Sequence, residues 1–95
     1  MAIVTLRYWA AAKEAAGTAE ETISAATLAE ALAAARGKAE DDGYTGQNSR
    51  LRAVLARSSF LIDGTPVGVR APAAVVLTDD CVIEVLPPFA GGAGP

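Results

Sequence analysis

The stretch Cys81-Val82-Ile83-Glu84-Val85-Leu86 runs directly into Pro87-Pro88-Phe89-Ala90-Gly91-Gly92, and the predicted fold is built around this junction. The first six residues are an apolar run in which Glu84 indicates the solvent-exposed face. We therefore predict a strand with Cys81, Ile83 and Val85 facing the core. Proline lacks a backbone N–H and fixes φ. Pro87-Pro88 should therefore end the strand, and the chain should continue from it in an extended conformation. After Phe89 the side chains are small, which predicts a domain over residues 1–87 and a flexible tail over residues 88–95.

Length and composition exclude several classes of protein. The chain has 95 residues, 52% of them hydrophobic, which is typical of one small globular domain. A net charge of −3 argues against a nucleic-acid surface. The chain enters a strand pattern at once, and no apolar run approaches the length of a membrane span, so we expect a cytoplasmic protein without a signal peptide or membrane contact. With one cysteine and no histidine, an intramolecular disulfide and histidine-based sites are impossible.

The first part of the chain predicts a strand, a helix and a second strand. Residues alternate over Ile3–Tyr8, with the even-numbered side chains on one face and Arg7 on the other, as in a half-buried strand. The alanine-rich stretch Trp9–Gly17 predicts a helix, and Gly17 is a natural stop. The polar stretch Thr18–Ser24 predicts a short edge strand.

The middle of the chain predicts the main helix. Thr27–Glu30 has the pattern of a capping box, in which the threonine oxygen accepts a helical N–H and the glutamate reaches back. One face is then apolar, through Leu28, Ala31, Leu32 and Ala35. Gly37 should end this helix, and the charged stretch Lys38–Gln47 predicts an exposed loop. Asn48 or Ser49 could cap a further short helix, in which the side chains of Leu51, Val54 and Leu55 face the core.

The last part predicts strands joined by turns. Ser59–Ile62 reads as a strand, and Asp63-Gly64 is typical of a two-residue type I′ turn, which needs positive φ at both positions. Pro66 limits the next segment to a short edge, and Thr78–Asp80 turns the chain into the final strand. One main helix packed across a small mixed sheet is an α+β arrangement.

This order of elements, together with the junction at Pro87–Gly92, resembles the β-grasp fold of the ubiquitin-like sulfur carriers. It is most similar to the small subunit of molybdopterin synthase, which typically ends in Pro-Pro-x-x-Gly-Gly. The opening Ile3–Gly17 is similar to that family's Arg-Tyr/Phe-Phe-Ala-x-x-Arg/Lys-Glu-x-x-Gly, and Thr27–Leu32 fits its Thr-Val-x-x-Leu region. Ile62–Gly64 and Leu77–Leu86 match its strand-turn segments. The resemblance covers nearly the whole chain and implies that the first and last strands lie parallel in the sheet centre.

The resemblance also implies a function for the tail. The carboxyl of Gly92 would be adenylated and then converted to a thiocarboxylate. The carrier would bind no cofactor or metal itself, because an E1-like adenylating enzyme uses the ATP and the large synthase subunit is the catalytic partner. Partner contacts would come from the tail and from the wet side of the central strands, through Pro87, Pro88, Phe89, Ala90, Gly91, Arg7 and Glu84.

Several alternatives stay open. The chain runs past Gly92 through Ala93-Gly94-Pro95, which favours a carrier of the same fold for another pathway (cysteine, thiamine or a secondary metabolite) that a processing peptidase trims before use. A ubiquitin-like modifier joined to lysines and an interaction domain with an inert glycine-rich end are two further readings. Phe89 could fold back on the last strand instead of anchoring a partner.

Three other groups of residues are weak candidates for chemistry. Cys81 lies inside a strand pattern and is expected to be a core residue with a raised pKa and low reactivity, so we do not predict it as the sulfur-carrying atom. Asp79-Asp80 and Glu40–Asp42 lie in turn and loop contexts and have no histidine partner. The glycines do not form a phosphate-binding loop, so the nucleotide site is expected on the partner.

Overall fold

A computed structural model of the chain describes residues 2–37 and 49–88. Its strands and helices are, in order, β1 (Ala2–Tyr8), α1 (Ala10–Ala16), β2 (Glu20–Ala25), α2 (Leu28–Ala34), α3 (Ser49–Leu55), β3 (Ser59–Ile62), β4 (Thr65–Pro66), the 3₁₀ turn η1 (Pro72–Ala74) and β5 (Cys81–Leu86). The strands form one five-stranded sheet in the order β2-β1-β5-β3-β4. The central strands β1 and β5 run parallel, and the other neighbours run antiparallel. The predicted α+β, β-grasp arrangement is therefore confirmed.

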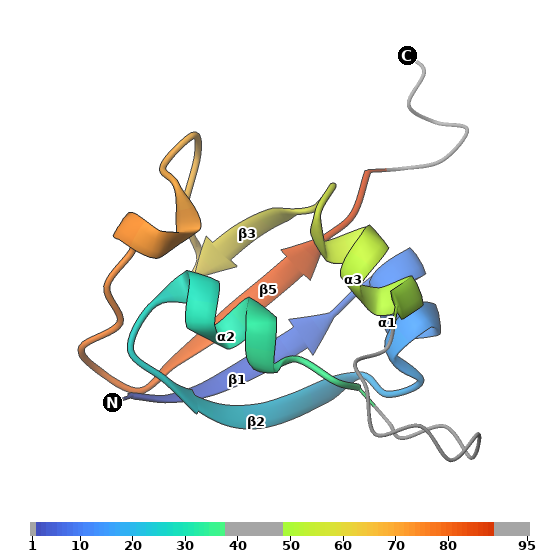
Figure 1. Cartoon of the computed structure of the whole chain (residues 1–95), viewed down its shortest axis with the longest axis horizontal. Helices are drawn as coiled ribbons and strands as arrows, with labels where there is room; N and C mark the ends of the chain where they lie inside the picture. Colours follow the sequence, from blue (N-terminus) through green and yellow to red (C-terminus); the bar gives the residue numbers. More distant parts are fainter. Residues whose placement is uncertain (1, 38–48, 89–95) are drawn as a thin grey trace.

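The helices lie on one face of the sheet, where they cover the core (Figure 1). The even-numbered side chains of β1 point to this face, since Val4, Leu6 and Tyr8 are all at most 1% exposed. Cys81, Ile83 and Val85 of β5 are buried beside them, as the alternation predicts. Strand periodicity in the two central strands is thus enough to define one wall of the core.

The turn between β3 and β4 has the backbone that its sequence predicts. Asp63 and Gly64 have φ of 49° and 86°, so both central residues are left-handed, as a type I′ turn requires. The Asp63 carboxylate also accepts a hydrogen bond from the Val82 N–H at 3.0 Å, which ties the turn to β5. Pro66 ends β4 after two residues, as expected for a proline at a sheet edge.

The start of α2 is as predicted, but its end is not. The Glu30 N–H donates to the Thr27 hydroxyl oxygen at 3.1 Å, and the Glu30 carboxylate accepts from the Ala26 N–H at 2.9 Å, one residue earlier than in a standard capping box. The helix ends at Ala34, because Ala35 already has extended backbone with ψ of 122°. Gly37 is therefore not the residue that stops α2.

Gly37 is required instead by a close approach of two segments. Its φ is +66°, and a Cβ built on it would lie 2.5 Å from the carbonyl oxygen of Ala16, the last residue of α1. A side chain at position 37 would therefore collide with backbone. The expectation that Gly37 ends α2 is therefore wrong. Position 37 needs glycine because of its contact with Ala16.

The helices that cover the sheet are of equal length, whereas the sequence predicted one main helix. The three α-helices each have seven residues, and α3 carries Leu51 and Leu55 into the core as predicted. Ser49 is the first residue of α3, while Asn48 and the predicted loop Lys38–Gln47 lie outside the described residues. None of the helices in the described ranges is long and apolar enough to cross a membrane.

Candidate functional site

The base of the tail is fixed by the centre of the sheet. β5 pairs with β1 on one side and β3 on the other, and its last residue, Leu86, is in register with Ser59. Pro87 is still buried, whereas Pro88 is exposed. The backbone is thus held on both sides up to Val85 and by β3 alone at Leu86, before the two prolines end the strand. The predicted site residues Phe89, Ala90, Gly91 and Gly92 lie outside the described residues.

The sheet face opposite the helices adjoins this exit. It carries the side chains that alternate with the core residues, and we call it the open face: Ile3, Thr5, Arg7, Trp9, Leu61, Val82, Glu84 and Leu86. Ile3 and Trp9 are 47% and 46% exposed, which is high for large apolar side chains in a small domain. The open face is therefore a mixed apolar and charged surface that leads to the tail.

The two predicted contact residues outside the tail come together on the open face. Arg7 and Glu84 are register neighbours across the parallel strands β1 and β5. They do not pair with each other: the Arg7 Nε lies 3.7 Å from the Glu20 carboxylate, and Glu84 accepts a hydrogen bond from the Trp9 Nε1–H at 3.2 Å. Both contacts are exposed, so they orient side chains more than they stabilise the fold.

Trp9 belongs to this surface, although the sequence analysis placed it only at the start of a helix. It is the N-cap residue of α1, has extended backbone, makes no capping hydrogen bond with its side chain, and continues the odd-numbered, outward face of β1. Extending the alternation of β1 by one more step, from Arg7 to Trp9, is the signal that would have found it.

Cys81 lies at the other end of β5 from the tail. Five residue steps along a strand separate it from Leu86, a distance of about 17 Å. The thiol is buried, and its pKa is raised by that burial first and then by the nearby carboxylates of Asp63, Asp80 and Asp79. This confirms the predicted core position and raised pKa, which make the thiol a poor nucleophile.

Two of the aspartates around Cys81 accept hydrogen bonds from the backbone. Asp80 accepts from the Ile3 N–H at 2.9 Å and so fastens the start of β1, while Asp63 fastens β5. Within residues 2–37 and 49–88, no group of three or more possible metal ligands is close enough to hold an ion. The predicted turn role of Asp79-Asp80 fits this geometry, and Glu40–Asp42 lies outside the described residues.

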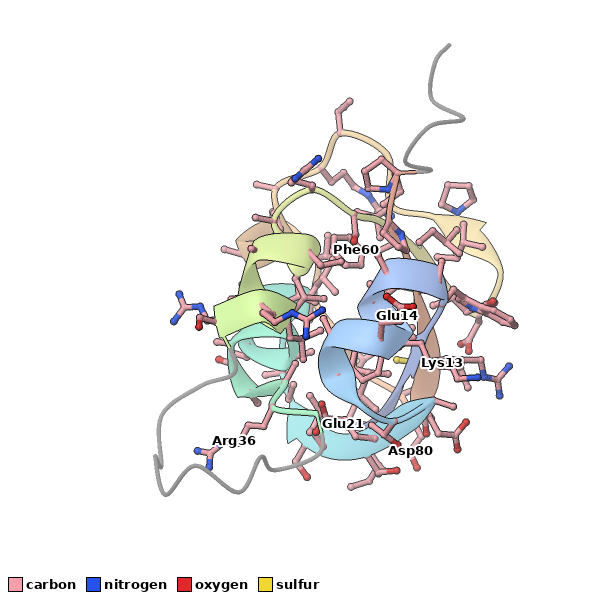
Figure 2. All side chains as sticks on the ribbon, turned by 90° about the vertical axis from the view of Figure 1, so that its right-hand side faces the viewer. Lys13, Glu14, Glu21, Arg36, Phe60 and Asp80 are labelled. Atoms are coloured by element: carbon pink, nitrogen blue, oxygen red, sulfur yellow. The ribbon has the colours of Figure 1, made fainter. Side chains whose placement is uncertain are left out.

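A partly buried polar cluster was not foreseen from the sequence. The Tyr8 hydroxyl donates to a carboxylate oxygen of Glu21, and the backbone N–H groups of Arg36 and Gly37 donate to the same oxygen at 3.0 and 2.7 Å. Figure 2 shows Glu21 and Arg36 on the same side of the molecule. Burial and the Glu21 carboxylate raise the pKa of Tyr8 well above its usual range. The cluster fastens the segment after α2 to the sheet.

Comparison with solved structures gives this fold clear relatives. The chain superposes on SAMP1 from Haloferax volcanii with a TM-score of 0.66 and 18% identity, covering 95% of this chain and 99% of that one. It superposes on a protein described as molybdopterin converting factor, subunit 1, from Pyrococcus furiosus with a TM-score of 0.62 and 16% identity, covering 94% and 100%. For the small archaeal modifier protein 1 from Methanosarcina acetivorans the values are 0.60 and 24%, covering 97% and 98%.

The TM-scores establish a shared fold, and the predicted likeness to ubiquitin-like carriers is confirmed at that level. A scan against sequence profiles of protein families found no match, and neither did a search of curated proteins.

Proposed function

We propose that this chain is a ubiquitin-like sulfur carrier that holds sulfur as a thiocarboxylate at Gly92 and serves as the small subunit of molybdopterin synthase. One observation carries the proposal. The last strand is paired on both sides up to Val85 and with β3 alone at Leu86, and the chain then continues through Pro87-Pro88 toward Gly91-Gly92. A rigid base followed by residues without bulky side chains suits a tail that must enter a narrow active site.

From this chain the chemistry needs only the carboxyl of Gly92; other molecules supply ATP-dependent activation, the persulfide sulfur and a reducing thiol. A carboxylate is a poor electrophile because it is charged and has no good leaving group. Attack of its oxygen on the α-phosphorus of ATP forms an acyl adenylate and releases pyrophosphate. A persulfide sulfur from a donor then attacks the acyl carbon, and AMP leaves. Reductive cleavage of the resulting acyl disulfide by a thiol leaves the thiocarboxylate at Gly92 and a disulfide on the donor side.

The open face and the tail together form the proposed docking surface. An E1-like adenylating enzyme and the large synthase subunit would each contact the open face near Arg7, Trp9 and Glu84 while taking up the tail. Phe89 is the proposed anchor, because buried aromatic residues dominate the energetics of many interfaces. No ATP site is proposed on this chain.

The test uses purified protein that ends at Gly92, incubated with ATP, the E1-like enzyme and a persulfide source. Intact mass should show replacement of one oxygen by one sulfur, and omission of ATP should abolish it. The matched control is Gly91→Val in the same form, in which a β-branched side chain should block entry to the adenylation site. Unmodified protein under conditions that load a known carrier would contradict the proposal. Addition of the large subunit and the pyranopterin precursor then tests the molybdopterin step.

A second function is favoured by the likeness to two small archaeal modifier proteins. The same adenylated carboxyl could be attacked by a lysine amine of another protein, with release of AMP and formation of an isopeptide bond. A tagged form ending at Gly92 would then give ATP-dependent conjugates that survive thiols and denaturation. Sulfur loading without such conjugates would favour the carrier.

A further inference from the structure

The helix side of the molecule has a groove that the proposed sulfur chemistry does not use. It lies between α2, the end of α3, β3 and the segment over residues 66–72, and has a volume of about 600 Å³. Its apolar lining includes Leu32, Leu55, Phe60 and Val67. Phe60 is in register with core-facing Val85, so its side chain points to the helix side of β3 (Figure 2). The groove is therefore open to solvent above a floor continuous with the core.

The rim of this groove is basic although the protein as a whole is acidic. Arg52 of α3 and Arg70 of the segment after β4 both line it and are both exposed. Over residues 49–78 the sequence has four arginines and a single acidic residue, Asp63. The Asp63 carboxylate accepts the Val82 N–H at the turn, and Asp63 does not line the groove. Two of these arginines, Arg52 and Arg70, line the groove and none of the described acidic residues does, in a chain of net charge −3.

We propose that this groove binds a peptide segment of a partner protein in which one or two large apolar side chains are flanked by acidic residues. The apolar side chains would cover the floor at Leu55, Phe60 and Val67, and the carboxylates would face Arg52 and Arg70. The volume lies within the range of about 300–1,000 Å³ that holds ligands of a few side chains. Charge complementarity of this kind selects the partner and speeds its approach.

Other classes of ligand fit this surface less well. A nucleic acid would gain little from two rim arginines and would be repelled by the net negative charge. Its bases would also need exposed aromatic side chains to stack on, and Phe60 is half-buried in the groove floor. An acidic peptide with an apolar anchor uses both the charge and the floor.

The groove and the proposed sulfur-transfer surface lie on different sides of the sheet. The groove opens on the helix side, whereas the open face is on the other side and contains Arg7, Trp9 and Glu84. A partner in the groove could therefore stay bound while the tail is in another protein's active site. The inference stands independently of the chemistry at Gly92.

The first experiment measures binding of defined probes to the full chain by fluorescence anisotropy at low salt. The main probe is a labelled peptide, Glu-Asp-Leu-Phe-Asp-Glu. A second replaces Leu-Phe by Ser-Ser, a third replaces the acidic residues by lysine, and a fourth is a single-stranded oligonucleotide of equal charge. Only the first should bind well, and amide chemical shifts should move at the groove residues Leu55, Phe60 and Val67 but not at Arg7, Trp9 and Glu84 of the open face. Equal binding of the Ser-Ser probe or the oligonucleotide would show a general anion surface and overturn the proposal.

The second experiment uses matched pairs of variants. Arg70→Glu should weaken the main probe by about tenfold, whereas Arg36→Glu, the same charge change at an exposed arginine outside the groove, should have little effect. Ala56→Phe places a large side chain in the groove and should block the probe, while Ala53→Phe, at an exposed alanine of α3 outside it, should not. Circular dichroism verifies that all four remain folded.

Equal effects within either pair would overturn the proposal. All four variants in the form ending at Gly92 should still be loaded with sulfur as fast as the unsubstituted protein. If the unsubstituted protein binds the probe but is not loaded with sulfur, the proposed function fails and the groove proposal stands. If it is loaded with sulfur but does not bind the probe, the groove proposal fails and the proposed function stands.

Discussion

A single carboxylate oxygen of Glu21 accepts three hydrogen bonds, from Tyr8, Arg36 and Gly37. These donors come from the sheet and from the segment that follows α2, so one side chain joins two layers. Tyr8 itself is 1% exposed. Its phenol is held in the neutral form, because a phenolate would lose hydration and would lie beside a carboxylate.

This arrangement predicts a tyrosine that resists titration. An exposed tyrosine ionises near pH 10, and the raised pKa of Tyr8 should keep it neutral there while the protein is folded. The ultraviolet absorbance of the wild-type protein minus that of Tyr8→Phe should therefore show the Tyr8 phenolate only once the protein unfolds. Because the unfolded chain loses this proton first, the stability due to Tyr8 is present below about pH 10 and falls as the pH rises above it. A Tyr8 phenolate signal near pH 10 in the folded protein, taken from the same difference, would contradict the assignment.

Cys81 gives a second test at the level of one residue. Its burial, its raised pKa and its place at the far end of β5 predict that Cys81→Ala, in the form ending at Gly92, is still loaded with sulfur. Intact mass after incubation with ATP, the E1-like enzyme and a persulfide source measures this. A small loss of stability is expected, because a buried sulfur is removed. Loss of loading in a folded Cys81→Ala protein would make the thiol, and not the tail, the carrier.

At the scale of elements, two glycines provide a matched comparison. Gly37 and Gly68 have nearly equal φ, +66° and +70°, but a Cβ on Gly37 would meet backbone at 2.5 Å and one on Gly68 would meet nothing within 4 Å. Gly68→Ala should cost only the left-handed strain, roughly 1 kcal/mol. Gly37→Ala should cost at least about 1–3 kcal/mol more, because α1 and the segment after α2 must separate. Urea unfolding measures both; equal losses would show that the two segments are not tightly apposed.

Much of the fold could be predicted because its signals are local. The alternation in β1 and β5, the Asp63-Gly64 turn and the Thr27 cap each depend on residues a few positions apart. The end of α2 could not be predicted in the same way. Gly37 is an obvious local stop signal, but its conformation is set by Ala16, a residue distant in sequence.

The candidate site was predicted only where its signals are local in the sequence. Outward-facing Arg7 and Glu84 followed from strand periodicity, but their partners Glu20 and Trp9 depend on sheet register and on where α1 begins. The groove was not predicted at all. Its lining comes from four separate segments, and no pattern within any one of them indicates a cavity.

At the scale of the whole molecule, we predict that Phe89 joins the proposed carrier to its partner. It follows the exposed Pro88 and is the proposed anchor in the large subunit. Phe89→Ala should leave the melting temperature nearly unchanged but weaken binding by roughly 2 kcal/mol or more in calorimetry. Val69→Ala, at a fully exposed apolar residue (104%) far from the tail in sequence, is the control and should bind normally. A large drop in melting temperature for Phe89→Ala would instead indicate that Phe89 packs on its own domain.

The proposed chemistry at Gly92 depends on the residues that follow it in the sequence. In this chain the Gly92 carboxyl is in a peptide bond to Ala93, so it cannot be adenylated until that bond is hydrolysed. The segment Ala93-Gly94-Pro95 also brings a proline ring, which fixes φ and is bulkier than glycine. From Pro88 to Gly92 the tail spans at most about 17 Å, and a channel shaped for that length and for Gly-Gly should exclude the extension. We therefore predict that a peptidase removes these residues before loading.

Two purified forms, one ending at Pro95 and one at Gly92, test this directly. Each is incubated with ATP, the E1-like enzyme and a persulfide source, and intact mass is followed over time. The Gly92 form should gain sulfur, and the Pro95 form should remain unmodified until a cell extract supplies the peptidase and the mass falls by three residues. The physical reason is that only hydrolysis of the Gly92–Ala93 bond creates the carboxylate that can attack ATP. Loading of the Pro95 form at the same rate, with all residues retained, would show that the activating enzyme accepts a proline carboxylate and that no trimming is needed.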